Sequence, residues 1–116
     1  MIFSFTRRRV ILPVLVIMFR AHADPMRLRI MNLLLRSPFC VCEMERILGL
    51  PQPLLSRHLA YLRNSGLVES NRDGMRVNYS FNEKYALLKR IGPFLLDTLG
   101  KDPVGSGDLR TLKTAV

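Results

Sequence analysis

Cys40 and Cys42 are the residues whose chemistry can be stated most directly from the sequence. They are the only cysteines among 116 residues, and a single residue separates them. A pair this close is a poor staple for a whole domain, which favours reduced thiols over a structural disulfide. Because thiolates are preferred ligands of soft metals and trivalent metalloids, the pair predicts a metal site or a redox site. The alternative is that both thiols fill small spaces in the core.

Geometry restricts how this pair can hold one ion. Residues two apart point about 200° from each other in a regular helix and to opposite faces in a strand. Chelation by Cys40 and Cys42 therefore requires an irregular first turn in the helix expected over residues 42–48. A helix N-terminus with arginines nearby also lowers a thiol pKa, so we expect partly ionised thiols at neutral pH.

A second group of residues has the chemistry of nucleic-acid recognition. Leu55, Leu59 and Leu62 recur at helical spacing and predict a helix with one buried side. The other side is polar and basic, and no acid occurs between Ile47 and Val68, as contact with phosphates requires. The candidate DNA-binding residues of this helix are Gln52, Ser56, Arg57, His58, Tyr61 and Arg63.

These candidates have different expected roles. Gln52 can pair with adenine, and Arg57 with guanine or phosphate, while Tyr61 and Arg63 are expected toward the DNA backbone. His58 falls near the inward flank, where a core or interface histidine is an equally good interpretation. For the arginines, the alternative is an ordinary solvated face.

The net charge agrees with a polyanionic partner. The chain carries 18 Lys and Arg against nine Asp and Glu, a formal net charge of +9. This balance favours a nucleic acid through counterion release, although an anionic membrane surface would also attract it. With 48% hydrophobic and 23% charged residues, a chain of this length predicts one folded domain.

Three short helices are expected to position the candidate residues. Asp24 and Pro25 are typical of an N-cap and a first helical position, and the helix they begin should end before Ser37 and Pro38. A second helix over residues 42–48 should end at Gly49. The third covers residues 52–64, and the last two form a helix-turn-helix.

A hairpin is expected directly after these helices. Residues 68–72 and 75–81 are typical of strands, and Asp73-Gly74 suits a two-residue turn between them. Arg72 and Arg76 lie beside the tip, which makes this hairpin a basic wing. The sequence therefore predicts a mainly α fold with a small β-hairpin, a winged helix-turn-helix with about five helices and a two-stranded wing.

The N-terminal residues predict contacts with a second copy of the chain. An apolar run from Val10 to Phe19 follows three arginines and indicates a helix that packs against another helix or protomer. A secretory signal peptide that ends at Ala23 is the alternative. The run is shorter than the roughly 20 residues of a membrane span, so we expect no stable membrane association.

The C-terminal residues complete the expected domain. Asn82 is expected to cap a last helix with a kink at Gly92-Pro93, and pairing of this helix with a second protomer would bury its apolar stripe. The predicted organisation is a single domain over residues 1–100, with a dimerisation helix in 1–23, a DNA-binding core in 24–81, a dimerisation helix in 82–100 and a flexible tail in 101–116.

Three segments resemble the arsenical-resistance repressor (ArsR/SmtB) family of bacterial metal sensors. The likeness covers about residues 20 to 81 in order and with matching spacing, and it implies a homodimeric, cytoplasmic winged-helix repressor on a palindromic operator. The Cys-Val-Cys-Glu segment implies release by trivalent arsenic or antimony bound at Cys40 and Cys42, with no cofactor needed for DNA binding. The three segments are Ala23 to Ile30, Phe39 to Glu43 and Gln52 to Leu59.

The sequence departs from the family pattern at three positions. Glu45 stands where some arsenic sensors carry a third cysteine, so a small exogenous thiol or a hydroxide would have to complete a three-ligand shell. Pro51 and Leu54 replace the Ser and Thr common in the family. Operator affinity or sequence preference is expected to change accordingly.

Two other functions use the same thiols. A repressor of this fold could respond to oxidants by forming a disulfide, and a thiol metal chaperone is a further alternative. We expect no enzyme, because the βαβ scaffold of thiol oxidoreductases, a Gly-rich phosphate loop and a Ser/His/Asp set are all missing from the sequence.

Overall fold

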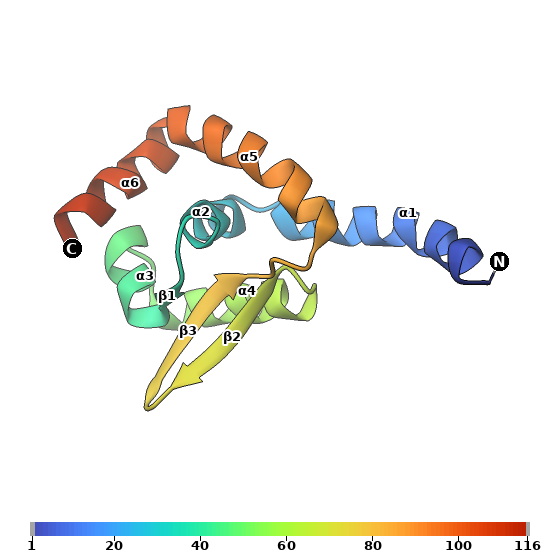
Figure 1. Ribbon diagram of the computed structural model, residues 1–116. Helices are drawn as coiled ribbons and strands as arrows, with labels where there is room; N and C mark the ends of the chain where they lie inside the picture. The colour runs from blue at the N-terminus through green and yellow to red at the C-terminus, as the bar shows by residue number, and fades with distance from the viewer. Residues whose placement is uncertain (1, 116) are drawn as a thin grey trace.

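The computed structural model describes residues 2–115, and the side chains of residues 11–114. Helices dominate this part of the chain, and a small three-stranded antiparallel sheet projects from them (Figure 1). This confirms the predicted mainly α winged helix. The elements are α1 (Ile2–His22), α2 (Pro25–Leu34), β1 (Phe39–Cys40), α3 (Val41–Leu48), α4 (Gln52–Asn64), β2 (Val68–Asp73), β3 (Arg76–Phe81), α5 (Ala86–Lys101) and α6 (Pro103–Ala115).

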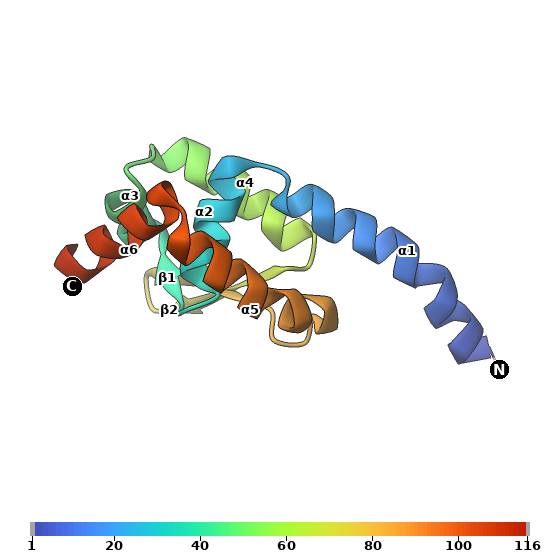
Figure 2. The same ribbon diagram turned by 90° about the horizontal axis from the view of Figure 1, so that it is seen from above.

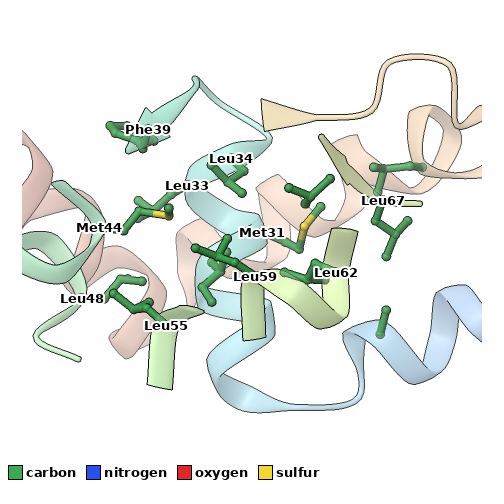
Figure 3. Close-up of a cluster of buried hydrophobic side chains, with 14 of the residues drawn as sticks. Met31, Leu33, Leu34, Phe39, Met44, Leu48, Leu55, Leu59, Leu62 and Leu67 are labelled. Carbon is green, nitrogen blue, oxygen red and sulfur yellow. The ribbon is translucent and has the colours of Figure 1, made fainter. Parts of the chain in front are cut away.

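The core lies between α2, α3 and α4. Asp24 caps α2 as predicted, since its Oδ1 accepts hydrogen bonds from the backbone nitrogens of Met26 (2.8 Å) and Arg27 (3.2 Å). The periodic leucines of α4 are completely buried, and they meet the buried face of α2 (Figure 3). The residues at this contact include Ile30, Met31, Leu33, Leu34, Met44, Leu48, Leu55, Leu59 and Leu62.

The turn between α3 and α4 has the geometry of a helix-turn-helix. Gly49 ends α3 with φ 67°, a left-handed conformation that residues with a Cβ adopt at a cost. Pro51 then precedes α4, which covers the predicted residues. α3 and α4 pack against each other, so a displacement of the first turn of α3 has a direct contact through which to reach α4.

The hairpin register differs by one residue from the prediction. Asp73 pairs with Arg76, so the two-residue turn is Gly74-Met75 rather than Asp73-Gly74. Gly74 takes φ 65° at the first turn position, which suits a type II′ turn, whereas Asp73 extends strand β2. Met75 is fully exposed at the tip.

Strand β1 is an element that the sequence did not predict. Phe39 pairs with Tyr79, and Cys40 pairs with Asn78, so the strand order is β1-β3-β2. A two-residue strand has too little pattern to be detected in isolation. Its consequence is that Cys40 lies beside the wing.

The segment predicted as a flexible tail forms helix α6, which packs against α2, α3 and α5. Asp102 caps the start of α6, because its Oδ2 accepts hydrogen bonds from the backbone nitrogens of Val104 (2.9 Å) and Gly105 (3.1 Å). A Cβ at Gly105 would overlap the carbonyl oxygen of Leu99, so glycine allows α6 to fold back closely on α5. Local composition was a poor guide because this helix depends on its tertiary contacts.

The start of α5 also differs from the prediction. Asn82 does not cap the helix. Its Oδ1 accepts a hydrogen bond from the backbone nitrogen of Lys84 (3.0 Å), and its Nδ2 donates one to the carbonyl oxygen of Gly66 (3.0 Å). It therefore forms a turn that ties the end of the wing to the end of α4. Helix α5 begins at Ala86 and contains Pro93.

Helix α1 extends away from the rest of the molecule (Figures 1 and 2). Its last turns contact α2, where Met18 and Ala21 are buried, but other apolar side chains of α1 are exposed. The exposed ones include Ile11, Leu12, Val16, Ile17 and Phe19. Within the residues that the structure describes, no helix has both the length and the apolar character needed to cross a bilayer.

Candidate thiol site and nucleic-acid interface

The two cysteines meet where strand β1 passes into helix α3. Cys40 is the N-cap of α3 in an extended conformation (φ −87°, ψ 166°), and Cys42 lies in the first helical turn. Their Sγ atoms are 3.2 Å apart, with Cys40 buried and Cys42 exposed. The expectation of a distorted helical turn was wrong, because the junction between strand and helix already turns the two sulfurs toward each other.

Two sulfurs this close fit a shared thiophilic atom. Two metal–sulfur bonds of about 2.3 Å easily span sulfurs that lie 3.2 Å apart. Within residues 2–115, no group of three or more His, Cys, Asp or Glu side chains could hold a metal ion. The donor set that the described chain offers at this junction is therefore two thiols.

Glu43 connects the thiol pair to the wing. One oxygen of its carboxylate, Oε1, accepts a hydrogen bond from the backbone nitrogen of Cys40 (2.9 Å). The same oxygen forms an ion pair with Nη2 of Arg76 (2.7 Å). The Cys40 hydrogen bond, followed by the contact with Arg76, lowers the pKa of Glu43 and keeps it ionised. Sequence reasoning did not single out Glu43, although a glutamate three residues after an N-cap is a known helix-start signal.

Arg76 reaches the thiol site rather than only the outer face of the wing. Its guanidinium, with 54% of the side chain exposed, binds Glu43, and this contact raises the arginine pKa. The sequence placed Arg76 with Arg72 as a DNA contact beside the hairpin tip. Arg72 is exposed and pairs with Val77 across the hairpin, so the two wing arginines have different surroundings.

The electrostatic environment of Cys42 differs from the prediction. The hydrogen bond with Cys40 raises the pKa of the Cys42 thiol, and this effect outweighs the opposing charges of Arg46 and Arg76. A lowered pKa was expected from the helix N-terminus and the arginines. That expectation left out the second thiol, which hydrogen-bonds to the first and disfavours ionisation of Cys42.

An open cavity of about 520 Å³ lies over the thiol pair, between α3 and the wing. Its lining combines the two thiols, the Glu43 carboxylate and two arginines with apolar groups from the hairpin. The lining residues are Cys40, Val41, Cys42, Glu43, Arg46, Met75, Arg76 and Val77. A ligand that reaches the sulfurs would therefore also meet positive charge.

The candidate residues of α4 form its outward face. Gln52, Arg57, Tyr61 and Arg63 are exposed, while Ser56 and His58 are half-buried. Nε2 of Gln52 donates to Oγ of Ser56 (2.8 Å), so these two side chains form one unit at the start of the helix. Figure 1 shows α4 and the hairpin on the side of the molecule away from α5 and α6.

Tyr61 is held by a residue that the sequence did not indicate. The guanidinium of Arg27 lies 4.1 Å from the centroid of the Tyr61 ring, a cation–π distance. Arg27 also donates to the carbonyl oxygens of Ala21 (2.7 Å) and Arg20 (3.0 Å) at the end of α1. Helix α1 and the outward face of α4 are therefore joined through one side chain.

Comparison with known proteins relates the middle of the chain to bacterial regulators. The family described as "Bacterial regulatory protein, arsR family" matches residues 24–70. The arsenic resistance transcriptional regulator ArsR1 of Pseudomonas putida is 44% identical over 64 residues, which are 54% of this chain and 50% of that protein. The chain spans about half the length of the first curated relatives it matches.

Solved structures extend the similarity over more of the molecule. HlyU from Vibrio cholerae is 31% identical, with a TM-score of 0.63 over 71% of this chain and 91% of that chain. A homodimeric winged helix-turn-helix DNA-binding domain from Mycobacterium bovis, described as a possible ArsR-family transcriptional regulator, is 27% identical. Its TM-score is 0.66, over 84% of this chain and 92% of that chain.

Proposed function

The chain belongs to the arsR family of bacterial regulatory proteins, and on that premise we propose that it is a dimeric transcriptional repressor released from operator DNA by a thiophilic metalloid. The metalloid binds Cys40 and Cys42, and trivalent arsenic or antimony is the proposed inducer. The observation that carries this proposal is the 3.2 Å separation of the two Sγ atoms at the start of the helix before α4.

The DNA-binding surface consists of α4 and the wing. Gln52, Ser56 and Arg57 contact bases at the start of α4, and His58 stands at the edge of this surface. The DNA backbone is contacted by Tyr61, Arg63, Arg72 and Arg76. The net charge of +9 and the absence of acids between Ile47 and Val68 support this assignment.

Dimer formation is proposed through α1 and α5. A cavity of about 510 Å³ between these helices is lined mostly by apolar side chains, including Ile11, Val14 and Leu87. Leu12, Val16 and Phe19 of α1 lie outside this cavity and are exposed in a single chain. The relative from Mycobacterium bovis is described as homodimeric, which supports a dimer. In such a dimer the two α4 helices would meet successive half-sites of an operator.

Release follows from the contacts around the thiols. In this proposal, a metalloid bound to both sulfurs replaces their hydrogen bond and repositions Cys40, whose backbone nitrogen donates to Glu43. Glu43 in turn holds Arg76 of the wing, and α3 packs against α4. Movement at the thiols therefore reaches both parts of the DNA-binding surface through contiguous contacts.

Thiol oxidation is a second candidate for the same site. A disulfide needs sulfurs about 2.05 Å apart, so a pair at 3.2 Å requires only a small approach. With peroxide as the oxidant, two thiols would form one S–S bond while their hydrogens and the peroxide leave as two waters. The repressor would then respond to oxidants in place of metalloids.

An electrophoretic shift assay on the DNA upstream of the chain's own coding sequence tests these alternatives. Arsenite, antimonite, cadmium, zinc and peroxide are titrated into the complex of the natural chain, Cys42→Ser and Met75→Ser. We expect arsenite and antimonite to weaken operator binding at least about 100-fold, about half of the free energy of a complete switch. Cys42→Ser should lose this response, whereas Met75→Ser removes a thioether from the same cavity and should keep it.

The outcomes separate the candidates. Release of the natural chain by peroxide but not by arsenite would favour the redox function. Unchanged release of Cys42→Ser by arsenite would remove the thiols from the mechanism, and no shift of DNA by any variant would remove the repressor function itself.

A further inference from the structure

The proposed inducer needs more ligands than the thiol pair supplies. Trivalent arsenic forms three bonds, and Cys40 and Cys42 provide two sulfurs. Within the described residues no third His, Cys, Asp or Glu joins them. Glu45, in the position where a third cysteine would stand, does not line the cavity, and the Glu43 carboxylate is occupied by Cys40 and Arg76. The third ligand must therefore come from outside the chain.

The cavity over the thiols has the size and charge to receive such a ligand. Its volume of about 520 Å³ is far larger than a hydroxide or a water requires. Cys42 is exposed toward it, so an incoming molecule can reach the sulfur.

Two arginines give this cavity a positive character. Arg46 stands one helical turn after Cys42, is exposed, and forms no ion pair with any described residue. Arg76 enters from strand β3 and uses Nη2 for its ion pair with Glu43. Among the described residues, Glu43 is the one acidic side chain that lines the cavity, and it is already paired with Arg76. The guanidinium of Arg46 therefore remains available to an incoming carboxylate.

We propose that this cavity binds a low-molecular-weight thiol that carries a carboxylate. Its sulfur becomes the third ligand of the metalloid, and its carboxylate binds Arg46. Three As–OH bonds of arsenite break and three As–S bonds form, while each of the three thiols gives its proton to a departing hydroxide as water. Arsenic remains trivalent, so no oxidant or reductant is needed. This inference rests on the proposed metalloid response of the same site.

A thiol that carries a carboxylate would use both the sulfurs and the arginines of this cavity. A neutral thiol could also close the three-sulfur shell, but it would gain nothing from Arg46. An acidic thiol forms a charge-assisted hydrogen bond in addition to its bond to arsenic, and both contacts are made in one bound state. The repressor would then respond to the thiol-bound form of the metalloid more strongly than to free arsenite.

Arsenite binding to the full-length protein, free of DNA, provides the test. Titrations are followed by the near-ultraviolet absorbance of arsenic–sulfur bonds, with equal concentrations of glutathione, 2-mercaptoethanol or cysteamine. Native mass spectrometry then identifies whether the small thiol is retained. We expect arsenite to bind about tenfold more tightly with glutathione than with either other thiol, and a protein–arsenic–glutathione adduct to be detected.

Matched arginine variants locate the effect. Arg46→Gln should abolish the preference for glutathione while arsenite still binds, and Arg46→Lys should retain part of it because the charge remains. Arg110→Gln removes the same charge from an exposed position on α6, outside the cavity, so it should keep the full preference.

The other possible results separate failure of this inference from failure of the proposed inducer. Equal arsenite affinity with all three thiols, or a glutathione preference unchanged in Arg46→Gln, overturns the inference but leaves the metalloid response intact. Failure of arsenite to bind with any thiol overturns the proposed inducer and this inference together.

Discussion

The two flanking helices, α1 and α6, are secured to the rest of the chain in opposite ways. α1 is rich in apolar residues, yet among its described side chains, residues 11–22, only Met18 and Ala21 are buried, and Leu12 and Phe19 remain 69% and 56% exposed. α6 is polar and contains two glycines, yet it packs against α2, α3 and α5. The apolar helix is the poorly covered one and the polar helix is the docked one.

Specific polar contacts explain the docking of α6. The carboxylate of Asp108 is buried and binds Arg29 twice, through Nε (2.9 Å) and Nη2 (2.8 Å). The same Nη2 donates to the carbonyl oxygen of Leu48 at the end of α3 (2.8 Å). An element without a strong apolar stripe is therefore docked by a well-satisfied ion pair together with the partly buried Leu109 and Leu112, whereas α1 keeps apolar side chains exposed.

The largest expected effect concerns α1. Leu12, Val16 and Phe19 form a stripe at helical spacing, and the double variant Leu12→Glu with Phe19→Glu should abolish its burial against a second copy. Burial of each side chain contributes about 2 kcal/mol to the free energy of association, and each residue occurs twice in a two-fold interface. Self-association should therefore weaken at least about 1,000-fold. Analytical ultracentrifugation over a concentration series measures this change.

Met75→Glu is the matched control for this variant. It places the same charge on a fully exposed apolar residue at the hairpin tip, remote from α1 in Figure 1, and should leave self-association unchanged. If the double variant sediments as the natural chain does, the exposed stripe of α1 is not the interface.

A smaller effect is expected at α6. Asp108→Ala removes one partner of the Arg29 pair and leaves the other charge, whose side chain is 20% exposed, without its carboxylate. Loss of one partner of a buried pair typically costs about 3 kcal/mol in the free energy of unfolding. Urea unfolding at fixed protein concentration measures the loss.

Asp97→Ala tests whether burial is the reason. Asp97 pairs with Lys101 at 3.2 Å on the exposed side of α5, where both side chains are mostly in solvent. Its loss should cost less than about 0.5 kcal/mol. Equal costs for the two alanine variants would show that the Arg29–Asp108 pair does not hold α6 in place.

The elements that sequence reasoning predicted are those with local signals. Asp24 and Pro25 start α2, and Leu55, Leu59 and Leu62 define the buried side of α4, because capping and periodicity act within a few residues. The same Asp-Pro signal occurs at Asp102-Pro103 and starts α6. It was overlooked because glycines and scattered charge after it resemble a loose tail.

The sequence singled out the two thiols of the candidate site, but it did not predict their geometry. The sequence indicated Cys40 and Cys42 and, since neither a regular helix nor a regular strand brings them together, an irregular first helical turn. The pair instead spans the junction between strand β1 and helix α3. The contact from Glu43 to Arg76 joins residues far apart in the chain. Its existence depends on strand pairing, and no local pattern reports it.

The smallest effect concerns Asp24, where α1 gives way to α2. Desolvation raises the pKa of the Asp24 carboxylate, but hydrogen bonds from the backbone nitrogens of Arg27 and Met26 outweigh this effect, so its pKa is lowered. Ionised Asp24 therefore adds stability above its unfolded pKa of about 3.9, and this contribution is lost as the pH falls through the lower folded value. Asn is also a good N-cap, so Asp24→Asn should cost only about 0.5 kcal/mol at pH 7. In urea unfolding, the difference in the free energy of unfolding between Asp24→Asn and the natural chain should shrink toward zero as the pH falls below about 3.9. A difference that stays constant with pH would show that it comes from the cap geometry and not from the charge.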